Sequence, residues 1–525
     1  MAKKYDVVIA GAGHNSLCVA AYLAKAGVDV CLVEKNPYVG GGAVSRELAA
    51  PGFITDLCSV IHIFIQPNPI IQRDELGLLS KYGLKYLYPD TQTVVYFDDG
   101  TYFTICKPLD MMLESIAKFS QRDAEKYKEF HDSTLQSLDL VLSGLYSPAP
   151  PFGSFVSLMD QSDEGRKLLK GMMLSALDII EDWFENEKVK IALTRWVSEV
   201  MVSPSTKGTG LIFFMMIPVM HKFGGGLPVG GAGVLSECLE KCVLDLGGTI
   251  KTSCSVKEFK MGNGECKGVV LDDGEEILAS KAVVSSLNIK QVFPDMIQDA
   301  SLPEGFVDRV KQLRFSDFQC FLQGLALHEP PAYVNDGKEL NEVLCVEFAP
   351  SNLEDYLRYF HDLGFGLAPH NPFVSCLTLL DPTRAPENKH TLYLYDFAPY
   401  DLKDGGPSRW DEIREEYAEE MLHFLRQYTT NMGPENIIGQ WLQSPLDLER
   451  HNPAFMHGDF AQLGSQLDQM IGNRPLSGWN YRTPVEKLFM CGPSTHPGCG
   501  VTGGGRAAVQ VVMEDLGIDF EKVIA

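Results

Sequence analysis

The sequence has no long hydrophobic run, and this absence argues against a membrane-spanning protein. Its most apolar stretch, residues 211–220 (LIFFMMIPVM), is about half as long as the roughly 20 residues that cross a bilayer as a helix. The chain begins with MAKK and enters a short apolar strand directly, so the apolar part is too short for a secretory signal. We therefore expect a cytoplasmic protein.

Positively charged residues are few, and no long run of lysine and arginine occurs. The chain has 45 Lys and Arg residues against 69 Asp and Glu residues, which gives a formal net charge of -24. Such an acidic surface repels phosphate backbones and the anionic leaflet of a membrane. We expect no nucleic-acid partner, and at most a peripheral membrane contact through an apolar patch.

The 13 cysteines include no CxxC pair, which argues against a redox disulfide or a zinc finger. Cys238 and Cys242 are four residues apart, but no His or further Cys accompanies them at zinc-ligand spacing. Buried thiols in a reducing compartment explain the cysteines, and we expect no metal site. The 525 residues exceed what one core holds, and a prior of roughly 150 residues per domain gives two or three domains.

The first part of the chain predicts a compact β-α-β unit. Residues 5–10 (YDVVIA) predict a buried parallel strand, because they are short, rich in valine and end at glycine. Residues 14–26 have apolar side chains at helical spacing, and residues 28–33 (VDVCLV) predict a second strand. This order of elements is typical of a dinucleotide-binding domain.

The turn between the first strand and the helix carries two of the three glycines of a dinucleotide-binding fingerprint. Gly11 permits the tight turn, and Gly13 lets the backbone approach a pyrophosphate. The phosphates would lie beside His14 and Asn15, where the free N–H groups and the dipole of a helix N-terminus favour anions. Ser16 replaces the third glycine, so we expect the helix to lie slightly further from the strand.

An acidic residue at the end of the second strand strengthens this interpretation. Glu34 follows Gly11 by 23 residues and is followed by Lys35. A carboxylate at this place accepts hydrogen bonds from ribose hydroxyls and disfavours a 2′-phosphate. A second glycine turn follows and would close over a diphosphate and ribityl chain; its candidate contacts are Gly41, Gly42 and Ala43.

The end of the chain again predicts strand, glycine loop and helix. Residues 488–512 read LFMCGPSTHPGCGVTGGGRAAVQVV, and the candidate ligand contacts are Gly492, Gly500, Val501 and Thr502. A helix N-terminus aimed at the N1–C2=O edge of a flavin would stabilise negative charge on its reduced form. NAD(P) alone would not need this second element, so the two ends of the chain together predict FAD as the cofactor.

Three blocks of the sequence resemble the phytoene desaturase and carotene ketolase branch of the FAD-dependent amine oxidase superfamily. They read VVIAGAGHNS…EKNPYVGGGA, LPVGGAGVLSECLEKCVLDLGGTI and LFMCGPSTHPGCGVTGGGRAA. The likeness is greatest to the pyridine nucleotide-disulfide oxidoreductase domain 2 type, which residues 481–488 also fit. In such relatives a backbone group after the middle helix holds the adenine, which implies Val256 here. Ser16 and Cys499 depart from the family pattern.

The resemblance implies an α/β fold with a Rossmann-type, glutathione-reductase-like FAD domain that is discontinuous in sequence. We assign residues 1–75, 222–300 and 455–525 to this domain, and residues 76–221 and 301–454 to an inserted α+β substrate domain. The expected reaction is FAD-dependent dehydrogenation, in which a hydride passes to flavin N5 and a C=C bond forms. The expected substrate is an apolar or alicyclic molecule, either a cyclic ketone or acid or an isoprenoid, and the electron acceptor stays open.

The candidate catalytic residues are His62, His457, Tyr481 and His496. Histidine can act as a base near neutral pH, and tyrosine can polarise a ketone oxygen, but each of the four could equally be structural. The methionines of residues 211–220, with Met172 and Met173, line an apolar pocket or belong to an ordinary core. An oxygenating ketolase and a non-catalytic FAD-binding scaffold stay as alternatives.

Overall fold

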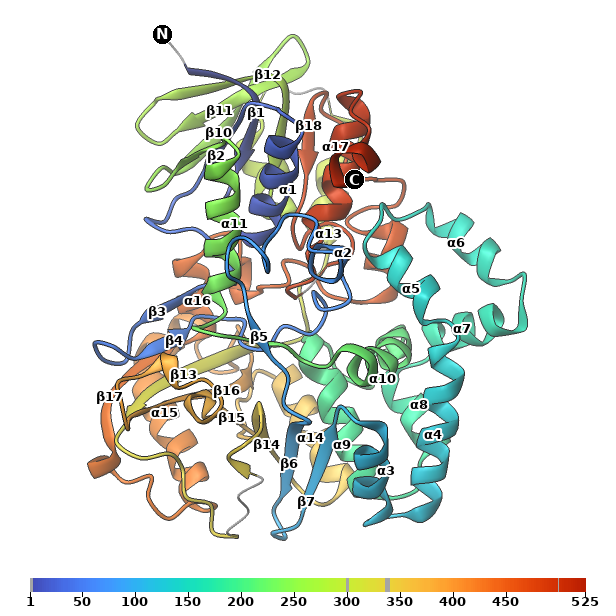
Figure 1. The fold of residues 1–525 in the computed structure, drawn as a ribbon, viewed down its shortest axis with the longest axis vertical. Coiled ribbons are helices and arrows are strands. Elements are labelled where there is room, and N and C mark those ends of the chain that lie inside the picture. Colours follow the sequence, from blue (N-terminus) through green and yellow to red (C-terminus); the bar gives the residue numbers. More distant parts are fainter. Residues whose placement is uncertain (1–2, 299–301, 336–339, 499) are drawn as a thin grey trace.

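The computed structural model describes residues 3–298, 302–335, 340–498 and 500–525. It contains two large sheets, one in the upper and one in the lower part of Figure 1, and a group of helices beside the lower sheet. Within the described residues, no helix combines the length and the apolar character that crossing a bilayer requires.

The first sheet has the strand order β10-β11-β12-β1-β2-β9, with β18 also paired to β12. Its strands are β1 (Lys3–Ala10), β2 (Val30–Val33), β9 (Thr249–Lys251), β10 (Val256–Gly262), β11 (Glu265–Leu271), β12 (Glu276–Ser285) and β18 (Leu488–Met490). β1 pairs in parallel with both β2 and β12, and β18 pairs in parallel with β12. Three separate stretches of the chain therefore build one sheet, which confirms the predicted discontinuous Rossmann-type fold.

Three helices cover one face of this sheet and lie side by side in Figure 1. They are α1 (His14–Lys25), α11 (Gly233–Asp245) and α17 (Gly505–Asp515). The side chains of β2 are buried throughout, as expected for a parallel strand covered on both faces. The opposite face packs against the short helices α12 (Ile289–Gln291) and α13 (Phe306–Gln312).

The predicted single strand at 249–259 is two strands, β9 and β10, because the chain turns sharply between them. Ser253 has a left-handed backbone (φ 55°), and its N–H donates to the carbonyl of Asn36. The next residue, Cys254, donates its N–H to the carbonyl of Glu34 at 2.8 Å. These bonds fix the start of β10 beside the end of β2 and so place Val256 next to Glu34.

The second sheet has the order β17-β13-β16-β15-β14-β6-β7. Its strands are β6 (Thr91–Phe97), β7 (Tyr102–Cys106), β13 (Gln319–Leu327), β14 (Cys345–Ala349), β15 (Phe373–Ser375), β16 (His390–Ala398) and β17 (Ile437–Gln443). Alternate residues of β13 face two different cores, one against α15 (Trp410–Arg426) and one against α14 (Leu353–Gly364) and α9 (Glu187–Val197). This double cover explains why β13 is buried along its whole length.

The helical group lies between the two early strands β6–β7 and the middle of the chain. Besides α9, it comprises α3 (Leu109–Ala117), α4 (Gln121–Leu135), α5 (Leu138–Leu145), α6 (Phe152–Met159), α7 (Asp163–Met173), α8 (Ala176–Trp183) and α10 (Gly210–Phe223). The apolar stretch 211–220 forms most of α10, which packs against α4, α7 and α8. The remaining longer elements are α2 (Pro69–Gln72), α16 (Pro445–His451) and α18 (Phe520–Ile524), and the small strand pairs β3 (Ser45–Glu47) with β4 (Ile54–Asp56) and β5 (Tyr86–Leu87) with β8 (Leu227–Pro228).

A buried arginine ties the two parts of the molecule together. Arg384 is 1% exposed and contacts Asp56 at 2.6 Å and Asp381 at 3.0 Å. It also donates to the carbonyl of Pro228 at 2.8 Å, and Asp381 accepts from the N–H of Gly230 at 2.7 Å. The glycine-rich segment that leads into α11 is thus held in place from the side of the second sheet.

Candidate active site

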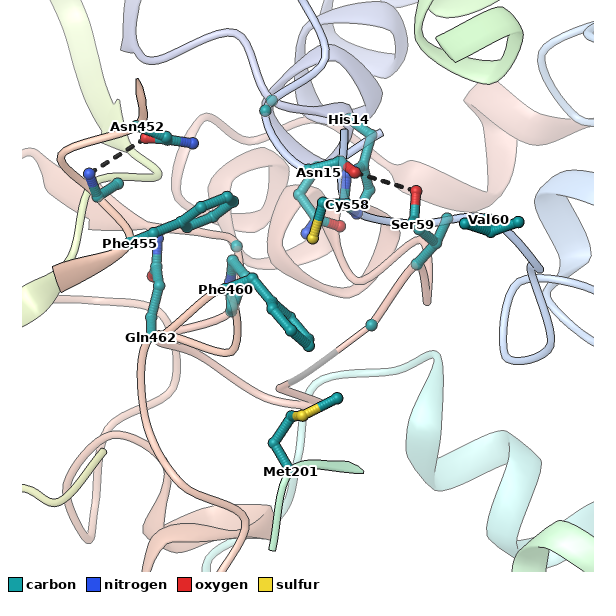
Figure 2. A pocket seen from close by; sticks show the side chains of 18 of the residues that line it. His14, Asn15, Cys58, Ser59, Val60, Met201, Asn452, Phe455, Phe460 and Gln462 are labelled. Carbon is teal, nitrogen blue, oxygen red and sulfur yellow. Dashed lines mark hydrogen bonds between the residues drawn. The ribbon is translucent and has the colours of Figure 1, made fainter. Parts of the chain in front are cut away.

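A cavity of about 380 Å³ is lined by residues from both sheets and from both ends of the chain. In Figure 2, His14 and Asn15 face Phe455 and Phe460 across this space, with Met201 approaching from another side. Most of the predicted cofactor contacts line it: Gly11, Gly13, His14, Asn15, Glu34, Lys35, Gly41, Gly42, Val256, Gly492, Gly500 and Val501. The structure therefore brings the two predicted half-sites together.

The two N-terminal glycine turns pack directly against each other. A Cβ on Gly41 (φ +63°) would lie 3.0 Å from the Cα of Gly13, and a Cβ on Gly11 (φ +88°) would lie 2.5 Å from Ser286 Oγ. Among the described residues, no side chain caps the N-terminus of α1, and its first turn has no acidic residue. The N–H groups of that turn are therefore available to an anion such as a diphosphate.

Glu34 shapes the turn and also faces the cavity. One carboxylate oxygen accepts from the N–H of Ala12 at 2.8 Å, and the other accepts from the N–H of Asn36 at 2.9 Å. Burial raises the pKa of this carboxyl, and the two backbone N–H groups oppose the rise. Because Lys35 and Val256 line the same region, this end has the groups expected to hold a ribose and its base.

The two helix N-termini meet at the cavity. The side-chain oxygen of Asn15 in α1 accepts from the N–H of Gly505 in α17 at 3.1 Å. A Cβ on Gly505 would lie 2.2 Å from the carbonyl oxygen of Asn15, so only glycine permits this approach. Ser16 is fully buried, and its hydroxyl lies 3.8 Å from the Cys491 sulfur. Close packing at this fingerprint is thus found between two helices, at Gly505.

Three of the predicted cofactor residues do not line the cavity but hold the loops that do. Ser16 is one of them. The Ala43 carbonyl accepts from the Ser236 hydroxyl at 2.8 Å, and the Thr502 carbonyl accepts from the Asn68 side chain at 2.9 Å. Cys499 lies outside the described residues.

His14 is a buried polar group that faces the cavity without a partner. The residue is 9% exposed, and neither ring nitrogen makes a hydrogen bond within the described residues. Burial lowers the pKa of His14 to about 4, so the ring is neutral near pH 7. Buried polar atoms are normally satisfied, and a bound ligand would supply the partner. Together with the glycine turns, this orphaned ring fits FAD.

None of the four predicted catalytic residues lines the cavity. The His62 ring is fully buried, with one nitrogen 3.0 Å from the Tyr86 hydroxyl, and burial lowers its pKa to about 3. The physical reason is side-chain alternation: Ile61 and Ile63 face the cavity, so His62 between them points away. The His457 ring instead stacks between Phe315 and Tyr400, with centroid separations of 4.4 and 4.7 Å.

The other two candidates stabilise the tail loop from outside. His496 donates through one ring nitrogen to the carbonyl of Gly144 at 2.9 Å, and burial lowers its pKa to about 4. Tyr481 is buried and donates its hydroxyl to the His496 carbonyl at 2.9 Å. Their proximity to the glycine loop in sequence does not bring their side chains into the cavity, because both are engaged by other parts of the chain.

The part of the cavity nearer the second sheet is mainly apolar. Its wall includes Trp196, Met216, Met220, Leu322, Leu344 and Phe373. Met216 and Met220 are one helical turn apart on α10 and so share a face. Met172 and Met173 are not among the lining residues, and Met173 is 63% exposed. The methionine-rich stretch therefore contributes to the cavity through two residues.

Two carboxyl groups interrupt this apolar wall, and neither was predicted from the sequence. Glu199 follows α9 and Glu347 lies in β14; both line the cavity. A signal was present, because each charge occurs inside a run of apolar residues, IALTRWVSEVMV and VLCVEFA. A charge in such a run is buried and needs a partner or a function. No group of three or more metal-ligand side chains occurs in the described part of the chain.

Comparisons with known proteins match the chain over nearly its full length. A model of the NAD(P)-binding Rossmann-like domain matches residues 9–73. The pyridine nucleotide-disulfide oxidoreductase domain-containing protein 2 of Rattus norvegicus is 29% identical, with 98% of this chain and 94% of that protein covered. A limonene dehydrogenase polypeptide of Castellaniella defragrans is 26% identical, with coverages of 99% and 96%. The lycopene-forming phytoene desaturase of Pantoea ananas is 24% identical, with coverages of 97% and 99%.

Solved structures show the same fold. An oxidoreductase from Methanosarcina mazei superposes with a TM-score of 0.62 at 17% identity, covering 97% of this chain and 100% of its own. Cyclohexylamine oxidase from Brevibacterium oxydans superposes with a TM-score of 0.61 at 16% identity, with coverages of 98% and 99%. At these identities the likeness concerns the fold alone. The sequence relatives confirm the resemblance inferred from the three sequence blocks.

Proposed function

From the premise that this chain is an FAD-dependent oxidoreductase, homologous to members of the amine oxidase and desaturase superfamily, we propose that it dehydrogenates an apolar, alicyclic substrate. The product would carry a new C=C bond. When bound, FAD supplies a hydride acceptor at its N5 atom. The remaining roles belong to the residues of the chain.

One observation carries this proposal: a single cavity joins the dinucleotide turns to an apolar chamber. Gly11, Gly13 and Glu34 lie at one part of it, Gly500 and Val501 at another, and Met216 at the apolar wall. Ligand pockets at the junction of two structural units commonly bring a cofactor and a substrate together. Because one cavity includes both parts, an apolar molecule in the chamber would contact the cofactor directly.

The residues of the chain bind, orient and exclude water. Helix N-termini and backbone N–H groups favour the diphosphate, and Glu34 favours ribose hydroxyls. Gln462 accepts from the backbone N–H of Ser494 at 2.9 Å and donates to the Ser286 carbonyl at 3.0 Å, which fixes the tail loop against the end of β12. The methionine and aromatic wall orients an apolar molecule through packing, because flexible methionines adapt to irregular shapes.

The chemistry of the relatives supports an apolar, non-carbohydrate substrate. One relative is named as a limonene dehydrogenase and others as phytoene or carotenoid desaturases. Two prolycopene isomerases of an Oncidium hybrid also match, at 23% identity. A test must therefore distinguish the loss of hydrogen from isomerisation.

The test is anaerobic reduction of the purified, flavin-loaded protein by chosen probes. Limonene, a saturated cyclic ketone and phytoene would each be mixed with the protein while the flavin absorbance is followed and the product mass is measured. We expect bleaching by at least one alicyclic probe and a product lighter by two hydrogens. Absence of bleaching with every probe, or a product of unchanged mass, contradicts the proposal.

The electron acceptor is tested in the same system. With an artificial dye as acceptor under strict anaerobiosis, a dehydrogenase continues to turn over, whereas an oxygenating enzyme stops. We expect continued turnover with the dye. A product that gains oxygen only in air would instead support the ketolase-like alternative.

A further inference from the structure

A buried group of charges lies on the side of the cavity formed by the second sheet. Arg195 is fully buried, and its guanidinium lies 2.7 Å from one carboxylate oxygen of Glu199. The same guanidinium lies 3.7 Å from a carboxylate oxygen of Glu347. The Tyr395 hydroxyl donates to the second oxygen of Glu199. One arginine is therefore shared between two carboxyl groups.

The two carboxyl groups reach the cavity, whereas the arginine does not. Glu199 and Glu347 are lining residues and Arg195 is not. Of the Glu199 side-chain surface, 27% is free of protein contact, compared with 2% for Glu347. A molecule in the apolar chamber therefore meets Glu199 first, with Arg195 behind it.

The charge count does not allow both carboxyl groups to ionise easily. Burial and mutual repulsion oppose the second negative charge, and the single guanidinium of Arg195 offsets only one of the two. Burial raises the pKa of Glu199 to about 8, partly offset by Arg195, and it raises the pKa of Glu347 as well. Near pH 7 the pair thus holds one proton, and its titration belongs to the pair.

The other titratable groups that face this pair are neutral. They come from α14, β13, β14 and β16, and burial raises the pKa of each of them: Tyr356, Tyr359, Cys320, Cys345 and Tyr393. Because none of these groups ionises near pH 7, proton exchange in this region falls to Glu199 and Glu347.

We infer that Glu199 is the proton acceptor of the cavity and shares its proton with Glu347. The inference rests on the proposed dehydrogenation. In that reaction two C–H bonds break on neighbouring carbons and a second bond forms between them. One hydrogen leaves as hydride, with its electron pair, to the flavin as oxidant; the other leaves as a proton to a carboxylate oxygen of Glu199. Charge and electrons balance in this step.

An infrared titration tests the proton without a substrate. In the flavin-loaded wild type, the carbonyl band of a buried protonated carboxyl should disappear as pH rises, with a midpoint near 8. The Glu199→Gln variant should lose this titrating band, and Glu354→Gln, whose side chain is 86% exposed in the wild type, should keep it. A band that titrates identically in Glu199→Gln and the wild type would overturn the inference.

Reduction kinetics test the role. With the alicyclic probe that bleaches the wild-type flavin, the limiting rate should rise with pH through the same midpoint, because the ionised carboxylate is the acceptor. Glu199→Gln should lower this rate by about 10²–10⁴-fold and remove the pH dependence, with unchanged flavin content. A higher half-saturating concentration with an unchanged limiting rate would assign Glu199 to substrate anchoring and refute proton transfer.

A milder variant keeps the test valid if Glu199→Gln fails to fold. Tyr395→Phe removes the hydroxyl that donates to Glu199, so the ionised form loses a hydrogen bond and the midpoint should move to higher pH. An unmoved midpoint in both assays would contradict the inference. If no probe bleaches the flavin, the proposed function fails, and the infrared titration alone decides whether Glu199 holds the proton.

Discussion

Replacing Gly41 by alanine should weaken FAD binding much more than it affects the rest of the molecule. Gly41 has a left-handed backbone, and its new Cβ would lie 3.0 Å from the Cα of Gly13, in the turn that approaches the diphosphate. Both atoms belong to the main chain or are fixed to it, so the two turns must separate. An alanine in the left-handed region costs about 1–2 kcal/mol, and relief of that cost moves the turn away from the cofactor.

The expected effect follows from this energy. About 1–2 kcal/mol corresponds to a roughly 5- to 30-fold rise in the dissociation constant for FAD. Gly27 gives a matched control, since it is also left-handed (φ +78°) but has open space around its missing Cβ. Gly27→Ala should lower the Tm without changing FAD affinity.

The assay is a titration of cofactor-free protein with FAD, followed by flavin fluorescence, with thermal unfolding of the cofactor-free forms measured beside it. Equal FAD affinities for the Gly41→Ala and Gly27→Ala variants would refute the assignment of the glycine turns to the diphosphate. So would a Gly41→Ala variant that binds FAD as the wild type does.

Three further predictions concern stability and the substrate chamber. Replacing Arg384 by Met leaves two buried carboxylates without their cation and should cost about 3–5 kcal/mol of unfolding free energy, whereas Arg409→Met, at an exposed ion pair, should change it by less than about 1 kcal/mol; equal Tm values would contradict this. Met220→Trp should fill the chamber and slow flavin reduction by alicyclic probes, whereas Met173→Trp at an exposed site should not, and equal rates would argue against the chamber. Because burial lowers the pKa of His14 from 6.5 to about 4, the unfolded chain binds more protons in that interval; the unfolding free energy should fall as pH decreases from 6.5 to about 4, and His14→Gln should make the decline shallower in denaturant titrations at each pH.

The elements that the sequence predicted well are those whose signals are local. The fingerprint glycines, Glu34 and the tail glycines each combine an unusual backbone requirement with a fixed neighbour in sequence. Such features depend on turn geometry, which a few residues determine. The β-α-β unit and the discontinuous first sheet follow from them, because one flavin site requires both ends of the chain to meet.

The side chains around the substrate chamber could not be predicted in the same way. His62 lies in a segment that does line the cavity, yet Ile61 and Ile63 face inward and His62 does not. The direction depends on its pairing with Gly226, far along the chain. The split between β9 and β10 likewise depends on the contacts of Ser253 with the end of β2. Long-range partners decide both features.

Glu199 and Glu347 show what a different question would have found. A search for histidine near glycine loops favours residues with familiar catalytic roles, whereas buried charge in an apolar run marks a cost that the fold must offset. The two glutamates are 148 positions apart in sequence (347 minus 199), so their shared arginine becomes visible only in the folded chain.

The joining of α1 and α17 at Asn15 and Gly505 has a consequence for biosynthesis. The first β-α-β unit leaves the ribosome early, but its sheet still lacks β18 and one covering helix until residues 488–515 have been made. An early-emerging nucleotide fold must therefore wait, incompletely covered, for almost the whole polypeptide. Loading with flavin is accordingly a late event in the life of each molecule, and a nascent chain that stops short of the final strand has no means of retaining the pigment.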